Sequence, residues 1–351
     1  MKGAKIMDIK ALVEDFKKLT TEECEILIRE LTKILRGDTD TLKSFLTNER
    51  FSGGRVCPLC GSTTVVRNGH TKNKTQRYFC RDCHKSFVIT TNSITFGTHK
   101  SLDVWEKFVS YMVYGMPSLR DLAAACGISK NTAFAWRHKI FDTLHKMADS
   151  VVLDGIVEAD ETFFPVSYKG NHVDSKSFVM PRSAHIDGVK STKRGISRDK
   201  VCVVCAVNRD GLSICKVSNL GRVSTENLFK AFNGRIKPGS TLCTDKMHAY
   251  KAFARENELI HIETKAGTSK NGIYGIQHVD GYHSGLKVYM KRFRGVATKY
   301  LNNYLAWNNF VNFAKNTKPE KLKILLSFAL ATPMKITNDA IPTRSPLPLL
   351  T

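Results

Sequence analysis

The spacing of apolar positions changes several times along the chain and divides it into regions of different structure. Residues 1–50 follow a helical pattern, in which Thr20 and Glu23 fit a capping box ahead of apolar residues at helical spacing. Residues 55–90 contain short β-prone runs between paired cysteines, and residues 101–147 return to helical spacing. This order predicts an N-terminal helical segment, a small β module and a second helical module.

From Leu153 onward, short apolar strands alternate with helices. Strands are predicted at 153–160, 201–207 and 212–217, and the Asp210-Gly211 turn joins the last two as a hairpin. The pattern continues with a helix over 224–236, a buried strand at 241–245, a helix over 248–258, a strand at 259–262 and one long helical region over 278–315. The tail after Pro333 is rich in proline, and we expect it to be loosely ordered.

The charge of the chain points to a polyanionic partner. Lys and Arg number 54 against 32 Asp and Glu, a formal net charge of +22, and nucleic acid is the commonest polyanion that such a surface binds. The first residues lack the apolar stretch of a signal peptide, and no apolar run approaches the roughly 18 residues of a membrane span. We therefore expect a cytoplasmic, nucleoid-associated protein without a membrane partner, whose cysteines are metal ligands or buried thiols.

Two CxxC pairs stand close together early in the chain. Cys57 and Cys60 form the first pair, and Cys80 and Cys83 form the second. Each CxxC turn presents two thiolates to one side, and the segment between the pairs is long enough for a hairpin that brings them together. The spacing predicts a zinc ribbon with one structural Zn²⁺, the alternative being four buried free cysteines.

A third CxxC lies inside a run of β-branched residues. Cys202 and Cys205 are three positions apart on a predicted strand, so their side chains point to opposite faces. We interpret both as core thiols.

Residues 118–141 fit a helix-turn-helix. Ser118 caps a first helix, Gly127 stands where that helix ends and turns, and Ser129 caps a second helix. In this motif the second helix enters the major groove. The residues expected to contact DNA are Lys130, Asn131, Thr132, Arg137 and Lys139. The small core of the module is assigned to Leu122, Ile128 and Trp136.

Three aspartates lie at the ends of predicted elements in the order strand, strand, helix. Asp160 follows a strand pattern, Asp245 ends a second strand, and Asp280 opens a helix. Lys287 follows Asp280 by two helical turns and shares its face. An RNase H-like fold brings acids in this order together, and carboxylates from three elements can hold two Mg²⁺ ions for phosphodiester chemistry while a lysine positions the phosphate.

Other interpretations of these acids stay open. Asp280 alone is also compatible with a helix N-cap. Glu158 and Glu161 flank Asp160 and should point away from it if the strand persists, because side chains alternate. Glu263 is an alternative third carboxylate, although it lacks a helical lysine partner.

These motifs together resemble the DDE-superfamily transposases of bacterial insertion sequences, in particular the "fifteen-ninety-five" group. The resemblance is carried by CPLC and CRDC, by VEADET, by the TD and HAY junction, and by HVDGYHSGLK followed by RFRGVATKYLNNYLAW. It covers about residues 55 to 313 and implies catalytic positions at Asp160, Asp245, Asp280 and Lys287. The third position departs from the group's usual Asn or Glu.

The expected organisation is a multidomain α+β protein. It has a helical N-terminal segment at 1–50, a zinc ribbon at 51–95, a helix-turn-helix at 96–150, an α/β RNase H-like (DDE) catalytic domain at 151–320 and a C-terminal tail at 321–351. An insertion at 161–200 separates the first two catalytic strands, and its basic residues suggest either a DNA contact or a solvated loop. Basic residues after the third acid, including Arg292 and Arg294, should line the rim of the active site and contact DNA.

The functional hypothesis is a transposase that binds double-stranded DNA at element ends and joins them to target DNA. It would need structural Zn²⁺ and catalytic Mg²⁺ or Mn²⁺, two ions in the active site, and a homodimer or higher assembly. The alternative is a DNA-binding regulator with the same ribbon and helix-turn-helix but a decayed nuclease fold.

Overall fold

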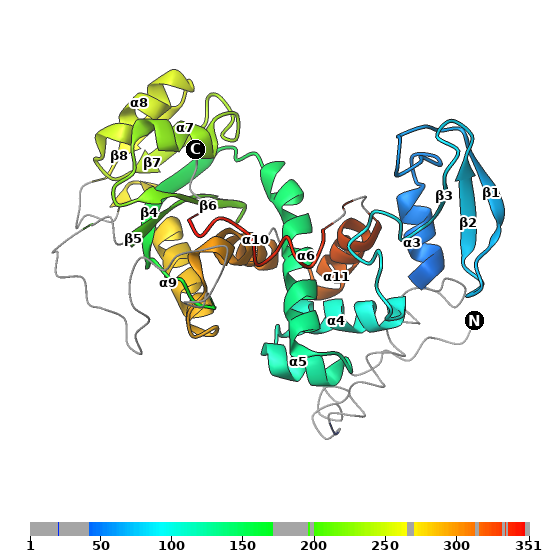
Figure 1. Cartoon of the computed structure of the whole chain (residues 1–351). Helices are drawn as coiled ribbons and strands as arrows, with labels where there is room; N and C mark the ends of the chain where they lie inside the picture. Colours follow the sequence, from blue (N-terminus) through cyan, green and yellow to red (C-terminus); the bar gives the residue numbers. More distant parts are fainter. Residues whose placement is uncertain are drawn as a thin grey trace, which may run out of the picture.

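The computed structural model places an α/β sheet domain at one end of the molecule and a smaller β module at the other, with helices between them (Figure 1). The structure describes residues 42–170, 200–264, 270–312, 316–331 and 336–347, together with Thr20, Ile196 and Met334. The predicted helix after Thr20 and most of the predicted insertion lie outside these residues. In the part described, no helix is both long and apolar enough to cross a membrane.

The smaller β module is an antiparallel three-stranded sheet. Its strands are β1 (Val65–His70), β2 (Gln76–Cys80) and β3 (Ser86–Val88), in the order β1-β2-β3. Tyr78 and Phe87 stack in its interior, and α3 (Leu42–Arg50) precedes it. Its buried residues belong to the same apolar cluster as the helices that follow, so the module is packed on the helical part of the chain.

Three helices come next, and they agree closely with the sequence pattern. They are α4 (Leu102–Tyr114), α5 (Leu119–Ala125) and α6 (Lys130–Asp149). Trp105 and Trp136 stack with ring centroids 3.7 Å apart and join α4 to α6. Helix α6 is 20 residues long, and Figure 1 shows it running from α5 toward the sheet domain.

The sheet domain is built on five strands. They are β4 (Ile156–Pro165), β5 (Lys200–Asn208), β6 (Ser213–Leu220), β7 (Thr241–Thr244) and β8 (Ile260–Glu263), in the spatial order β6-β5-β4-β7-β8. Strands β4, β5 and β6 are antiparallel neighbours, whereas β7 runs parallel to β4, and β8 parallel to β7. The predicted hairpin at Asp210-Gly211 is confirmed, and Gly211 has the positive φ of +86° that such a turn favours.

Helices cover both faces of this sheet. On one face, α7 (Thr225–Phe232) and α8 (His248–Glu256) pack over residues such as Val157, Ala159 and Cys202. On the other face, α9 (Gln277–Lys291) and α10 (Leu301–Asn312) pack over residues such as Val203 and Cys205. Cys202 and Cys205 are fully buried in different clusters, which confirms the interpretation of this CxxC as core thiols.

The predicted helical region over 278–315 is confirmed only in part. The chain forms α9 and α10, separated by a turn and the short 3₁₀ helix Thr298–Tyr300. Arg294 and Gly295 have φ values of +48° and +93°, which a continuous helix cannot contain. Lys169, at the start of the predicted insertion, donates to the carbonyl oxygens of Arg294 and Gly295 and holds this turn.

The C-terminal region packs back onto the helices. Helix α11 (Lys318–Leu326) begins with a Thr317/Glu320 capping box, and its apolar side packs with α4. In the proline-rich segment beyond it, Ile341 is 1% exposed, and Arg344 forms an ion pair with Asp142 of α6. The expectation of a loosely ordered tail is therefore wrong for the part that the structure describes, because tertiary contacts hold this segment.

Candidate metal centres and active site

The four predicted cysteine ligands converge in the small β module. Their sulfur atoms all lie within 4.8 Å of one another, with Cys57 Sγ 3.8 Å from Cys83 Sγ and Cys60 Sγ 3.6 Å from Cys80 Sγ. Such separations suit four thiolates around one tetrahedral Zn²⁺, whose bonds to sulfur are about 2.3 Å long. This clustering, together with the exposure of Cys60, favours a metal site over the alternative of four buried free cysteines.

The two cysteine turns have matching backbone geometry. Each is followed by a residue with positive φ: Gly61 at +80° after the first and His84 at +55° after the second. Backbone N–H groups of Cys83 and Asp82 lower the pKa of the Cys80 thiol to about 6, which favours the thiolate that a metal requires. Burial raises the pKa of Cys83, so a cation is needed to ionise the whole set of thiols.

A second candidate centre lies on the sheet domain, where β4 meets α9. Asp160 is on the central strand β4, opposite Cys205 of β5, and its side chain is 24% exposed. Asp245 directly follows β7, the parallel neighbour of β4 on its other side. Its Oδ1 accepts from the Met247 backbone N–H, a local bond that orients the carboxylate at the strand end.

Helix α9 contributes the remaining groups. Asp280, His283 and Lys287 follow one another at intervals of three and four residues and so share one helix face. Ligand atoms of Asp160, Asp280 and His283 lie within 4.8 Å of one another, and His283 Nδ1 is 3.7 Å from Asp160 Oδ2. His283 was not predicted from the sequence, although its position one turn after Asp280 was a usable signal.

The electrostatics of Asp160 join the other predicted residues to this cluster. The pKa of Asp160 is raised to about 6, mainly by burial and also by the charges of Asp245 and Asp280, against the lowering effects of a backbone hydrogen bond at Glu161 and of Lys287. Carboxylates that lie close together repel one another when they are ionised, and this repulsion is costly unless bound cations compensate for the negative charge. The arrangement thus has the charge pattern of a site for divalent cations.

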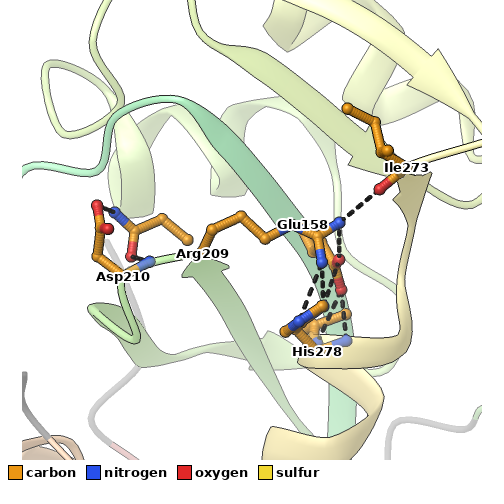
Figure 2. Close-up of polar contacts among 7 residues, drawn as sticks. Glu158, Arg209, Asp210, Ile273 and His278 are labelled. Carbon is orange, nitrogen blue, oxygen red and sulfur yellow. Dashed lines mark hydrogen bonds and ion pairs between the residues drawn. The ribbon is translucent and has the colours of Figure 1, made fainter.

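A buried carboxylate next to this site fixes α9 against β4. Glu158 is 0% exposed, and its Oε2 accepts from the backbone N–H groups of His278 and Val279 in the first turn of α9. Its Oε1 accepts from His278 Nδ1 and lies 2.9 Å from a guanidinium nitrogen of Arg209. Figure 2 shows Arg209 reaching from the β5–β6 turn to Glu158, and it also donates to the Ile273 carbonyl oxygen. We use the name α9 clamp for Glu158, Arg209 and the backbone N–H groups of His278 and Val279 that Glu158 binds.

The expectation that Glu158 and Glu161 both point away from Asp160 is therefore wrong for Glu158. Residues two apart on a strand share a face, and both Glu158 and Asp160 face α9. Glu161 does lie on the opposite face, where its Oε1 accepts from the buried Tyr250 hydroxyl at 2.6 Å.

The clamp also excludes the N-cap interpretation of Asp280. Helix α9 begins at Gln277, and the Asp280 N–H already donates to the Ile276 carbonyl oxygen as an ordinary helical bond. The N–H groups of His278 and Val279 in the first turn donate to Glu158, so strand β4 supplies the cap of this helix. Asp280 is therefore not the N-cap, and its exposed carboxylate is available to a ligand.

The alternative acid Glu263 does not join the cluster. It ends β8, paired with Thr244, and is exposed. Among the described residues, the grouping that could hold a metal on this domain contains Asp160, Asp280 and His283 only.

The predicted DNA-contacting residues of α6 divide into two groups. Lys130 and Asn131 are exposed and Thr132 is half-buried at the start of the helix, where the Ser129 hydroxyl accepts from the Thr132 N–H. Arg137 and Lys139 are instead 2% and 8% exposed. Arg137 donates to the Pro117 carbonyl oxygen and braces α6 against the preceding loop, so burial argues against a DNA contact by these two side chains.

Other predicted positions agree with the structure. Arg292 and Arg294 are exposed just after α9. The caps at Ser118 and Ser129 are confirmed, as is the turn at Gly127, with φ of +59°. Leu122 and Trp136 are buried as predicted.

Two family models match the chain. An ISXO2-like transposase domain covers residues 152–311, and an InsA N-terminal domain covers residues 56–84. The first match contains the acid cluster, and the second contains all four cysteines of the ribbon.

Relatives from mobile elements match as well. An uncharacterised protein of the transposable element ISH50 from Halobacterium salinarum is 26% identical over 295 residues, 82% of this chain and 95% of that protein. The InsA protein of insertion element iso-IS1N from Shigella dysenteriae is 32% identical over 76 residues, 22% of this chain and 79% of that protein. Among solved structures, a pre-cleavage Mos1 transpososome is 10% identical with a TM-score of 0.20, and the match covers 69% of this chain and 82% of that chain.

Proposed function

We propose that this chain cleaves DNA at element ends and joins them to target DNA. The premise is that the chain belongs to the insertion-sequence transposases with an InsA-type zinc ribbon and an ISXO2-like domain. The observation that carries the proposal is the meeting of Asp160, Asp280 and His283 within 4.8 Å, with the charges of Asp245 and Lys287 acting on Asp160. This cluster lies where the central strand β4 meets α9, and the mutual repulsion of its acids calls for bound cations.

The strand arrangement supports an RNase H-like catalytic domain. Three antiparallel strands, β4 to β6, are extended on the other side of β4 by two parallel strands, β7 and β8. This order puts the strand of Asp160 in the centre, and β7 ends beside it at Asp245. Acids from β4, β7 and α9 would then face one point, as a DDE-type site requires.

The acids would hold divalent cations, and the flanking groups would handle the DNA. Mg²⁺ or Mn²⁺ on Asp160, Asp245 and Asp280 would activate the attacking oxygen and stabilise the leaving oxygen, with two ions as the proposed complement. Lys287 is exposed on the same face of α9 as Asp280, and there it can position a phosphate group. Arg292 and Arg294 extend the positive charge beyond α9 toward the path of the DNA backbone.

End recognition is assigned to the N-terminal part of the chain. Lys130, Asn131 and Thr132 at the start of α6 occupy the place from which a recognition helix contacts base edges. The ribbon, with one Zn²⁺ on its four cysteines, adds a second contact to the duplex. We propose domain limits at 51–95 for the ribbon, 96–150 for the helix-turn-helix and 151–320 for the catalytic part, flanked by 1–50 and 321–351. A dimer or larger assembly at the nucleoid would bring two element ends together.

The test is a strand-transfer assay on the zinc-loaded full chain with its own element ends and Mg²⁺ or Mn²⁺. We expect joined products, and we expect Asp160→Asn and Asp245→Asn each to lower the rate by at least about a thousandfold, because each loses a charged metal ligand. Binding to end DNA in a gel-shift titration should be unchanged in both variants. A wild-type protein that binds ends but yields no product would favour the decayed regulator, and an active Asp160→Asn protein would refute the acid site.

A further inference from the structure

His283 occupies an unusual position for a buried histidine. It is 6% exposed on the inner face of α9, one turn after Asp280 and one turn before Lys287. Its Nε2 is buried and has no hydrogen-bond partner among the described residues. The other ring nitrogen, Nδ1, faces Asp160 Oδ2 and is the atom of His283 that can bind a ligand, so the role of this nitrogen calls for an explanation.

The distance to Asp160 excludes a direct hydrogen bond from His283 Nδ1 to this carboxylate as that role. His283 Nδ1 lies 3.7 Å from Asp160 Oδ2, beyond the range of an N–H···O bond. Two ligands about 2.1–2.2 Å from a common ion are separated by about 3.0 Å when they are adjacent and by about 4.3 Å when they are opposite. The observed separation of these two atoms falls within this range.

The surroundings of His283 suit a metal ligand. The titratable groups that face it are Asp160 from β4, and Asp280 and Lys287 from its own helix. The α9 clamp sets the start of the same helix, so the position of His283 relative to Asp160 is fixed by buried contacts. The imidazole is thus held beside two carboxylates before any ion arrives.

We infer that His283 is a nitrogen ligand of the divalent cation held between Asp160 and Asp280. A mixed set of one imidazole and carboxylates suits a first-row transition ion better than Mg²⁺, which takes oxygen ligands. The site would therefore bind Mn²⁺ in preference to Mg²⁺. The assignment of this ion to strand transfer rests on the proposed function, whereas the nitrogen ligand can be detected without any reaction.

The experiment uses electron spin echo spectroscopy on the zinc-loaded full chain with less than one equivalent of Mn²⁺. Coupling of the Mn²⁺ electron spin to a directly bound imidazole nitrogen modulates the echo. We expect this modulation in the wild type and in His70→Ala, whose histidine is exposed on the ribbon strand β1. It should be absent in His283→Asp, in which an oxygen ligand replaces the nitrogen but Mn²⁺ still binds.

The same proteins give a second readout in metal titrations. His283→Ala should weaken Mn²⁺ binding at least about tenfold, since even groups that only hydrogen-bond to ligands have effects of that size. His283→Asp should narrow the preference for Mn²⁺ over Mg²⁺. A bound Mn²⁺ without nitrogen modulation in the wild type, modulation that persists in His283→Asp, or no Mn²⁺ binding at all would each overturn the inference. Nitrogen modulation in a protein that performs no strand transfer would instead contradict only the proposed function.

Discussion

The two candidate metal centres are built in opposite ways. The cysteine site takes all four ligands from residues 57–83, within two short turns that bring their own backbone geometry. The acid cluster takes its groups from β4 and α9, and Asp160 and Asp280 are 120 positions apart in the sequence. The first site is local, and the second depends on the packing of a whole domain.

This difference shows where each site is vulnerable. The ribbon is a small module, and if its four cysteines hold zinc as proposed, metal binding and folding of the module are linked. The acid site is held by groups that never touch the metal, above all the α9 clamp, which fixes the helix that carries Asp280 and His283. A local site should fail through its ligands, and a distributed site should fail through its supports as well.

The largest effect should come from loss of a cysteine ligand. Cys57→Ser should lose the zinc that we expect mass spectrometry to find at one per chain in the wild type, and the ribbon should unfold, since structural zinc contributes about 10–16 kcal/mol in zinc-finger peptides. Proteolysis should then cut within residues 51–95. Cys126→Ser is the matched control, because Cys126 is a buried cysteine outside the ribbon.

The acid site should survive this loss. Mn²⁺ binding by the sheet domain should be unchanged in Cys57→Ser, because the buried residues of the ribbon belong to a different apolar cluster from the residues that pack on the two faces of the sheet, although α9 and α10 contact both. Loss of Mn²⁺ binding together with zinc would show that the two centres are not independent.

The next effect concerns the clamp. Glu158→Ala should lower the free energy of unfolding by about 3 kcal/mol, because it leaves two first-turn N–H groups and Arg209 without their buried partner. It should also weaken Mn²⁺ binding, although Glu158 is not a predicted ligand. The control is Glu226→Ala, which removes an exposed ion pair with Lys230 and should change stability by less than about 1 kcal/mol.

Denaturant unfolding and metal titration distinguish the possible roles of the clamp. Reduced stability with unchanged Mn²⁺ affinity would mean that packing on β5 alone positions α9. In that case the contrast between the two sites would be weaker than the structure implies.

A smaller effect concerns the raised pKa of Asp160. A carboxyl group whose pKa rises from its usual 3.8 to about 6 contributes stability that is present below pH 3.8 and lost as the pH rises through 6. Without Mg²⁺ or Mn²⁺, Asp160→Asn should therefore be more stable than the wild type at pH 7.5, by roughly 1–3 kcal/mol. This gain should shrink at pH 4.5 and reverse when Mn²⁺ is added.

Unfolding curves of the zinc-loaded proteins at the two pH values measure this difference. An equal difference at both pH values would show that burial and neighbouring charges do not raise the pKa of Asp160 in the folded protein. The cysteine site should show no such gain in stability on removal of a ligand, because the proposed zinc would be part of the folded ribbon.

The smallest change in stability is expected at Asp280. Asp280→Ser should alter the free energy of unfolding by less than about 1 kcal/mol, since Asp280 is exposed, is not the cap and loses only a favourable charge near the helix start. Strand transfer should nevertheless fall sharply in Asp280→Ser and remain measurable in Asp280→Glu, which keeps the carboxylate. Full activity of Asp280→Ser would remove this acid from the proposed site.

Much of the architecture followed from local patterns in the chain. The cysteine spacing identified the four ribbon residues that converge, the serine caps located α5 and α6, and the period of the apolar runs located the strands of the sheet. These features depend on neighbours within a few residues, so backbone geometry and side-chain alternation were enough to predict them.

Other features were decided only by contacts between distant segments. The cap of α9 comes from Glu158, which precedes His278 by 120 residues, and no pattern within the helix reveals a cap that another strand supplies. The position of Arg137 on the second helix predicted a DNA contact, but the fold buries this side chain against the loop at Pro117. The ion pair between Arg344 and Asp142 holds the proline-rich tail on α6. Sequence thus determined the candidate ligands, because residue type and spacing define what can bind a metal. The tertiary structure decided which of them meet, because burial and long-range hydrogen bonds have no local signature.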